Sequence, residues 1–166
     1  MTLEFVRYAD GADVLRHTEP YLLRKEAENS LTLGVAALSL PSGADNLWAS
    51  VSDDGQIVGT AFDTPPYKTV VTAASDEVID LIAAEIHGAG RSPTGILGPS
   101  ASSLRFAETW SRLSGETFLP GLNQRIYRID RVMPPASASG DLRLAQVDDV
   151  PLLAGWFESF SEETGT

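Results

Sequence analysis

"LWASVSDDGQIVGTAFD" at residues 47–63 is the stretch that decides the fold. The pair Asp54-Gly55 lies between two runs, 47–52 and 56–62, in which residue character alternates along the chain. An Asp-Gly pair between alternating runs favours a tight β-hairpin turn, because these residues tolerate the positive φ that the turn requires. We therefore predict two antiparallel strands here.

The segments on either side of this hairpin predict a fold that mixes strands with helices. Upstream, residues 3–9 favour a strand, and residues 10–40 favour two helices separated near Pro20, because proline fits poorly inside a helix. Downstream, the apolar periodicities predict five further elements, namely strand 67–74, helix 75–90, short strand 94–99, helix 100–115 and a long strand within 116–132. This order indicates an α/β or α+β fold.

Composition excludes several classes of function. The 166-residue chain is 43% hydrophobic and 21% charged, which is typical of a globular protein. Its net charge of -11 disfavours nucleic acid as a partner, because phosphate backbones repel acidic surfaces. No apolar run approaches the roughly 20 residues that span a bilayer, and no secretory signal is visible, so we expect no membrane partner and a cytoplasmic location.

The residue inventory also limits the chemistry. The chain has no cysteine, which excludes disulfides and thiolate catalysis, and its two histidines cannot form a three-histidine metal site. We expect no metal. No Gly-x-Ser-x-Gly pattern that would support a serine nucleophile occurs either.

Two ends of the chain resemble each other. Residues 7–14, "RYADGADV", and residues 143–150, "RLAQVDDV", share Arg, Ala, Asp and Val at one spacing, with an offset of 143 − 7 = 136. A Pro-, Ala- and Ser-rich linker at 133–140 precedes the second copy. We predict a domain over 1–132 and, over 141–166, the first strand and helix of a truncated second repeat. The alternative is an ordinary strand-to-helix turn with an aspartate cap.

The order of the elements resembles the GNAT superfamily of N-acetyltransferases, and more closely the degenerate N-terminal half of two-domain GNAT proteins. The matching stretches cover most of residues 1–135 and are "EPYLLRKEAENSLTLG" (19–34), "DGQIVGTAFDTPP" (54–66), "GILGPSASSLRFAETW" (95–110) and "NQRIYRIDRVMPP" (123–135). The resemblance implies a mixed, mostly antiparallel central sheet flanked by helices. It also implies acetyl-CoA as cofactor and a small-molecule or peptide amine as acceptor.

The expected cofactor loop departs from the family pattern. GNAT domains that bind CoA follow the central strand with an Arg/Gln-x-x-Gly-x-Gly/Ala loop, whose N–H groups wrap the pyrophosphate. The matching stretch "VVTAASDEVIDL" (70–81) contains no glycine and no arginine, and its acidic pair at 76–77 opposes an anion. The resemblance still implies a groove beside Val71, Thr72 and Ala73, where backbone groups are expected to contact a pantetheine arm.

The acceptor side is expected in "RKEAEN" (24–29), because this helix region borders the acceptor site in GNAT folds. Acetyl transfer to an amine needs a group that removes a proton, so Glu26, Glu28 and Asn29 are the acceptor-side candidates. Arg24 and Glu28 are spaced i, i+4, a spacing at which they can pair on a helix. The alternative is a solvated helix face or a domain contact.

Three hypotheses follow. In the first, the chain is the N-terminal part of a GNAT-type N-acetyltransferase and does not bind CoA productively by itself. In the second, it is a non-catalytic GNAT-like binding or dimerisation module, in which a homodimer covers the strand edge at 141–146. In the third, it is a lone acetyltransferase with an atypical CoA site near Val71–Ser75, which measurable CoA binding would favour.

Overall fold

The computed structural model of the chain describes residues 2–38, 45–134 and 141–164. The chain divides into two compact units, Met1–Arg128 and Ile129–Thr166. Most of the predicted linker at 133–140 lies outside the described residues, as does most of the loop that precedes the hairpin.

The first unit is built on a five-stranded sheet with the order β1-β2-β3-β4-β5. The strands are β1 (Leu3–Tyr8), β2 (Leu47–Asp53), β3 (Gln56–Asp63), β4 (Thr69–Val71) and β5 (Ile96–Leu97). The first four strands pair antiparallel, and β4 pairs parallel with β5. The predicted hairpin is confirmed, and so is the mixed, mostly antiparallel sheet. Both turn residues have positive φ, 47° at Asp54 and 81° at Gly55.

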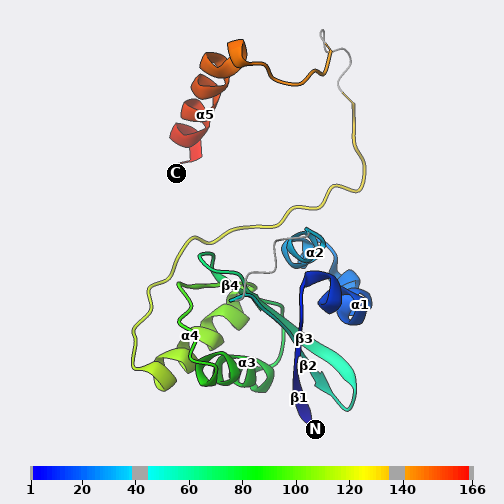
Figure 1. Ribbon diagram of the computed structural model, residues 1–166, viewed down its shortest axis with the longest axis vertical. Helices are drawn as coiled ribbons and strands as arrows, with labels where there is room; N and C mark the ends of the chain where they lie inside the picture. Colours follow the sequence, from blue (N-terminus) through cyan, green and yellow to red (C-terminus); the bar gives the residue numbers. More distant parts are fainter. Residues whose placement is uncertain (1, 39–44, 135–140, 165–166) are drawn as a thin grey trace. The chain divides into compact units, whose positions relative to one another are not determined.

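Helices cover both faces of this sheet (Figure 1). On one side lie α1 (Gly11–Leu22), the 3-10 helix η1 (Leu23–Lys25) and α2 (Ser30–Ala37), and on the other lie α3 (Asp76–Gly88) and α4 (Ser100–Ser114). The larger core cluster, on the α3 and α4 side, contains Leu47, Ala49, Val51, Ala61, Val71, Val78, Ile79, Ile82, Ala83, Ile86 and Phe106. The smaller cluster, on the α1 and α2 side, contains Val14, Ala36, Trp48, Phe62 and Val70.

The predicted helix break near Pro20 is wrong. Helix α1 continues through Pro20 and ends at Leu22, whose side chain is completely buried. Pro20 lies in the exposed last turn, where burial of Leu22 offsets the hydrogen bond that proline cannot make. The break comes later, where Nδ2 of Asn29 donates to the carbonyl of Leu22 at 2.9 Å and satisfies one of the helix's unpaired carbonyls.

The predicted strands within 116–132 and over 141–146 are also absent. Both segments are extended chain that forms no β-ladder with any residue in the described ranges. Alternation along a segment predicts which side chains share a face, but a strand also requires a neighbour for its N–H and C=O groups. The apolar side chains of Ile126 and Tyr127 are accordingly exposed.

The second unit contains the predicted helix, as η2 (Val147–Asp149) followed by α5 (Val150–Thr164). Asp149 accepts the backbone N–H of Gln146 at 2.8 Å and pairs with Arg143 at 2.6 Å, which lowers the pKa of the Asp149 carboxyl. In the first copy Asp13, at the matching position, accepts the N–H of Ala9 at 3.2 Å. The accepted N–H lies three residues before Asp149 but four residues before Asp13, so the two contacts differ by one residue, and the repeat stays a prediction.

Helices α3 and α4 are joined by a polar cluster around Asp80. Its carboxylate accepts from Nε of Arg105 at 2.7 Å and from the hydroxyl of Thr109, and it lies 3.7 Å from the guanidinium of Arg112. The hydrogen bond from Arg105 is the main cause that lowers the pKa of Asp80 below its ordinary value. The charged carboxylate is thus the form that stabilises the folded chain.

This cluster predicts a pH dependence of stability. Because the pKa of Asp80 is lower in the folded chain than in the unfolded chain, its contribution is present above the unfolded value of about 3.9 and is lost as the pH falls through the folded value. We expect the gap in urea midpoint between the unsubstituted chain and Asp80→Asn to be widest near neutral pH and to close at acidic pH. A gap that does not change with pH would contradict this assignment.

None of the helices in the described ranges has the length and apolar character that crossing a bilayer requires.

Candidate functional site

Two strands of the sheet are interrupted at neighbouring points. In the β2–β3 pair, Val51 lies opposite Gly59 and Ser52 lies opposite Ile57, so Val58 has no partner across the pair. Such a bulge turns backbone groups out of the ladder, and bulges are common next to functional sites. Strand β4 ends at Val71, two residues before Ala73.

The two interruptions bring two carbonyl groups to one tyrosine. The hydroxyl of Tyr21, on α1, lies 3.2 Å from the carbonyl oxygen of Val58 and 3.1 Å from that of Ala73. The Oγ1 of Thr72 lies 3.4 Å from the same hydroxyl. A tyrosine has one hydroxyl proton, so it satisfies one carbonyl at a time. The other carbonyl can then accept a hydrogen bond from a ligand.

A hollow of about 390 Å³ opens at this point. It is lined by Tyr21, Arg24, Lys25, Asn29, Gln56, Ile57, Val58 and Ala73. This volume lies within the range of sites that hold small molecules. We call this feature the Tyr21 hollow. Its lining comes from the end of α1, from η1, from the residue before α2, from the bulged start of β3 and from the exit of β4.

The lining of the Tyr21 hollow is positively charged although the chain as a whole is acidic. It includes Arg24 and Lys25 and contains no aspartate or glutamate, whereas the net charge of the chain is -11. The Lys25 ammonium pairs with Glu28 at 3.1 Å. Arg24 has no ion-pair partner in the part of the chain that the structure describes. The hollow therefore offers one unpaired and one shared cation to a ligand.

The pairing that the spacing allows between Arg24 and Glu28 does not form. Glu28 pairs instead with Lys25, three residues before it. The i, i+4 spacing brings side chains together on a continuous α-helix, but this segment is a 3-10 helix followed by a turn.

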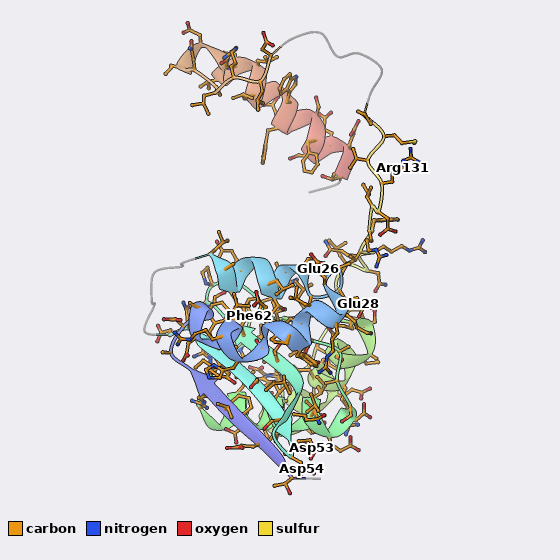
Figure 2. All side chains as sticks on the ribbon, turned by 90° about the vertical axis from the view of Figure 1, so that its right-hand side faces the viewer. Glu26, Glu28, Asp53, Asp54, Phe62 and Arg131 are labelled. Carbon is orange, nitrogen blue, oxygen red and sulfur yellow. The ribbon has the colours of Figure 1, made fainter. Side chains whose placement is uncertain are left out.

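Of the three predicted acceptor-side residues, Asn29 alone lines the Tyr21 hollow. It is 8% exposed, and its side-chain nitrogen is held by the carbonyl of Leu22. Glu26 and Glu28 are exposed and do not line the hollow. Figure 2 shows both at the surface of the first unit, away from Asp53 and Asp54 at the tip of the hairpin. A catalytic role for these three residues stays a prediction.

The predicted cofactor-side residues lie at the exit of β4. Val71 and Thr72 are buried, and Ala73 lines the Tyr21 hollow. The N–H of Ala74 donates to the hydroxyl of Ser102 at 3.4 Å, and the carbonyl of Ala73 faces Tyr21. The N–H of Ala74 is thus engaged within the domain, and contact of Val71, Thr72 and Ala73 with a pantetheine arm stays a prediction.

The first turn of α3 carries its own anion. The Glu77 carboxylate is hydrogen-bonded by its own backbone N–H and by the hydroxyl of Ser75, and both contacts lower the pKa of this carboxyl. Asp76 lies beside it, 3.6 Å from Arg105. A charged carboxylate on the N–H groups of a helix start takes the place that a phosphate would need.

Sequence reasoning missed Tyr21, Val58 and Gln56. Tyr21 lies three residues before the predicted acceptor segment 24–29, and the two cations are the first two residues of that segment, so their proximity was a usable signal. The bulge at Val58 left no comparable signal, because it depends on which residue the partner strand skips.

Within residues 2–38, 45–134 and 141–164, no group of three or more His, Cys, Asp and Glu side chains is placed to hold a metal ion. No protein-family model matches the chain, and neither a curated protein nor a solved structure matches it. The fold and the hollow together define a mixed α/β protein with a small-molecule-sized site beside a bulged strand.

Removal of the Tyr21 hydroxyl is expected to lower the stability of the chain measurably. Tyr21→Phe leaves the carbonyls of Val58 and Ala73 without their shared donor while the ring stays in place. We expect the free energy of unfolding to fall by about 1 kcal/mol, measured by urea denaturation. Tyr8→Phe is the matched control, since it removes the 2.8 Å contact with Ser50 but leaves the hollow unchanged. Unaltered stability of Tyr21→Phe would contradict the described contacts.

Proposed function

We propose that this chain is the N-terminal, acceptor-binding part of a GNAT-type N-acetyltransferase, which transfers acetyl from acetyl-CoA to an amine. The observation that carries the proposal is the convergence of the Val58 and Ala73 carbonyls on Tyr21 at the Tyr21 hollow. Carbonyl oxygens accept hydrogen bonds from an amine, which fits a small-molecule or peptide amine acceptor. The order of strands and helices from β1 to α4 follows the order that the resemblance implies and gives further support, although the strand expected within 116–132 is absent.

The reaction requires the acceptor to lose a proton. The amine nitrogen attacks the thioester carbonyl, an N–C bond forms, the C–S bond breaks, and CoA leaves as a thiolate that takes up a proton. Glu26 and Glu28 are the candidates for removing the ammonium proton, and they would act through a water because neither lines the hollow. The carbonyls at Tyr21 would orient the nitrogen.

In this proposal the chain does not bind acetyl-CoA productively by itself. The Glu77 carboxylate at the first turn of α3 and the Ala74 N–H, which donates to Ser102, both support this part of the proposal. The cofactor would be held by another domain that has a Gly-rich loop.

Calorimetric titration of the chain with acetyl-CoA tests the proposal, together with an assay for CoA thiol release in the presence of an amine panel. We expect no binding heat up to roughly 1 mM acetyl-CoA, which means a binding free energy of less than about 4 kcal/mol. We also expect no thiol release above the blank. Binding with a Kd below about 100 µM, accompanied by thiol release, would favour the lone acetyltransferase with a CoA site near Val71–Ser75.

A second candidate function, a non-catalytic binding or dimerisation module, is favoured by a separate observation. Helix α5 exposes three aromatic side chains, Trp156 at 63%, Phe157 at 72% and Phe160 at 57%. Exposed aromatic groups of this kind mark interaction surfaces. Sedimentation equilibrium tests it, since a homodimer that Trp156→Ser dissociates would support the module and a monomer at all concentrations would oppose it.

A further inference from the structure

The lining of the Tyr21 hollow is chemically different at its two sides. Two exposed cations, Arg24 and Lys25, stand on η1, and the carbonyls of Val58 and Ala73 stand at the half-buried hydroxyl of Tyr21. We infer that the hollow takes a primary amine that also carries an acidic group, either a phosphate or a carboxylate. This inference rests on the proposed function and names the class of acceptor.

The acidic group would be held at the η1 side. Arg24 has no ion-pair partner among the described residues, so its planar guanidinium is available for two parallel hydrogen bonds to a carboxylate or phosphate. The Lys25 ammonium has three donors, and its 3.1 Å contact with Glu28 uses one. Because no carboxylate lines the hollow, an acidic ligand meets local attraction there although the net charge of the chain is -11.

The amine would be held at the Tyr21 side. An ammonium offers up to three donors, and the Tyr21 proton leaves at least one of the two carbonyls available. A phosphate or carboxylate is disfavoured at this side, because two carbonyl oxygens that only accept hydrogen bonds repel a second acceptor. The two sides therefore fix the direction of the ligand, with the amine beside β3 and β4 and the acid on η1.

Three small probes separate the two sides of the site. O-phosphoethanolamine carries both groups, ethanolamine carries the amine, and inorganic phosphate carries the acid. Binding of each to the full chain is followed by backbone amide shifts at one fixed ionic strength. We expect O-phosphoethanolamine to bind at least tenfold more tightly than either of the other probes, with shifts at Arg24, Lys25 and Ala73.

Substitutions then test whether Arg24 binds the acidic group of the ligand. Arg24→Gln should weaken O-phosphoethanolamine binding roughly tenfold and leave ethanolamine binding unchanged. Lys68→Gln is the matched control, because Lys68 is exposed, has no ion pair among the described residues and does not line the hollow. Its affinity for all three probes should equal that of the unsubstituted chain. Thermal midpoints within a few degrees would show that both variants are folded.

The outcomes separate this inference from the proposed function. Equal affinity for ethanolamine and O-phosphoethanolamine would overturn the acidic class of acceptor and leave the amine site standing. If inorganic phosphate bound as tightly as O-phosphoethanolamine, both the acidic class of acceptor and the proposed amine site would be overturned, since the amine would contribute nothing to the affinity. No shifts with any probe at millimolar concentration would also overturn both. If acetyl-CoA displaced O-phosphoethanolamine, and Arg24→Gln abolished the binding of both ligands, the two cations would be assigned to the phosphates of CoA instead.

Discussion

Asp63→Ala is expected to lower the free energy of unfolding by about 3 kcal/mol, because it leaves the largely buried Arg91 without its ion-pair partner. Asp63 ends β3 and is 4% exposed. Its carboxylate accepts from Nε of Arg91 at 2.8 Å and from the hydroxyl of Thr69 at 2.9 Å. The Arg91 side chain is 19% exposed, so water replaces the lost carboxylate poorly. The loss is measured as the shift of the urea denaturation curve.

The matched control is an exposed aspartate in a similar ion pair. The side chain of Asp76 is 69% exposed and lies 3.6 Å from Arg105, so Asp76→Ala should cost less than about 1 kcal/mol. Arg91→Ala and the double variant complete a cycle that isolates the pair from other effects of Asp63→Ala. An Asp63→Ala protein as stable as Asp76→Ala would contradict the buried ion pair.

Gly98→Ala is expected to lower the free energy of unfolding by about 1–3 kcal/mol, because the added methyl group would overlap the neighbouring strand. A Cβ at this position would lie 2.5 Å from the carbonyl oxygen of Val71 and 3.0 Å from its Cγ2. The carbonyl belongs to the backbone of β4, so relief requires a shift of that strand. Since β4 leads to Ala73, we also expect weaker ligand binding in the Tyr21 hollow.

Gly95→Ala is the control for this prediction. A Cβ at Gly95 would meet side-chain carbons of Lys68 at 3.3 Å, and an exposed lysine side chain moves easily. The free energy of unfolding should therefore change by less than about 0.5 kcal/mol. If the two alanine variants were equally stable, the close approach of β4 to Gly98 would be wrong.

Sequence reasoning predicted the parts of the fold that depend on local periodicity. The turn at Asp54-Gly55 and the apolar face of α3, including Ile79 and Ile82, are properties of neighbouring residues and were predicted well. The segment within 116–132 has equally clear alternation, but strand formation depends on a partner elsewhere in the chain. Pro20 was misread because burial of Leu22, two residues later, outweighs the local preference.

The candidate site was predicted less completely for a related reason. Asn29 and Ala73 were proposed from a resemblance, and the structure brings both to the Tyr21 hollow. The contact of Tyr21 with Val58 joins residues 37 positions apart and depends on a bulge, so no spacing rule predicts it. The charge of the lining was hidden because "RKEAEN" contains as many acids as bases, and the three-dimensional arrangement separates them.

Mapping of bound ligands onto backbone amide signals is the measurement that tests the central claim most directly. The isotope-labelled chain is titrated separately with O-phosphoethanolamine and with acetyl-CoA. The proposal predicts that O-phosphoethanolamine shifts the backbone amide signals of Arg24, Lys25, Val58 and Ala73. It predicts that 1 mM acetyl-CoA shifts no signal, because a Kd above 1 mM corresponds to a binding free energy of less than about 4 kcal/mol. The proposal would be contradicted if acetyl-CoA shifted the signals of residues 74–79 and O-phosphoethanolamine shifted no signal of the Tyr21 hollow.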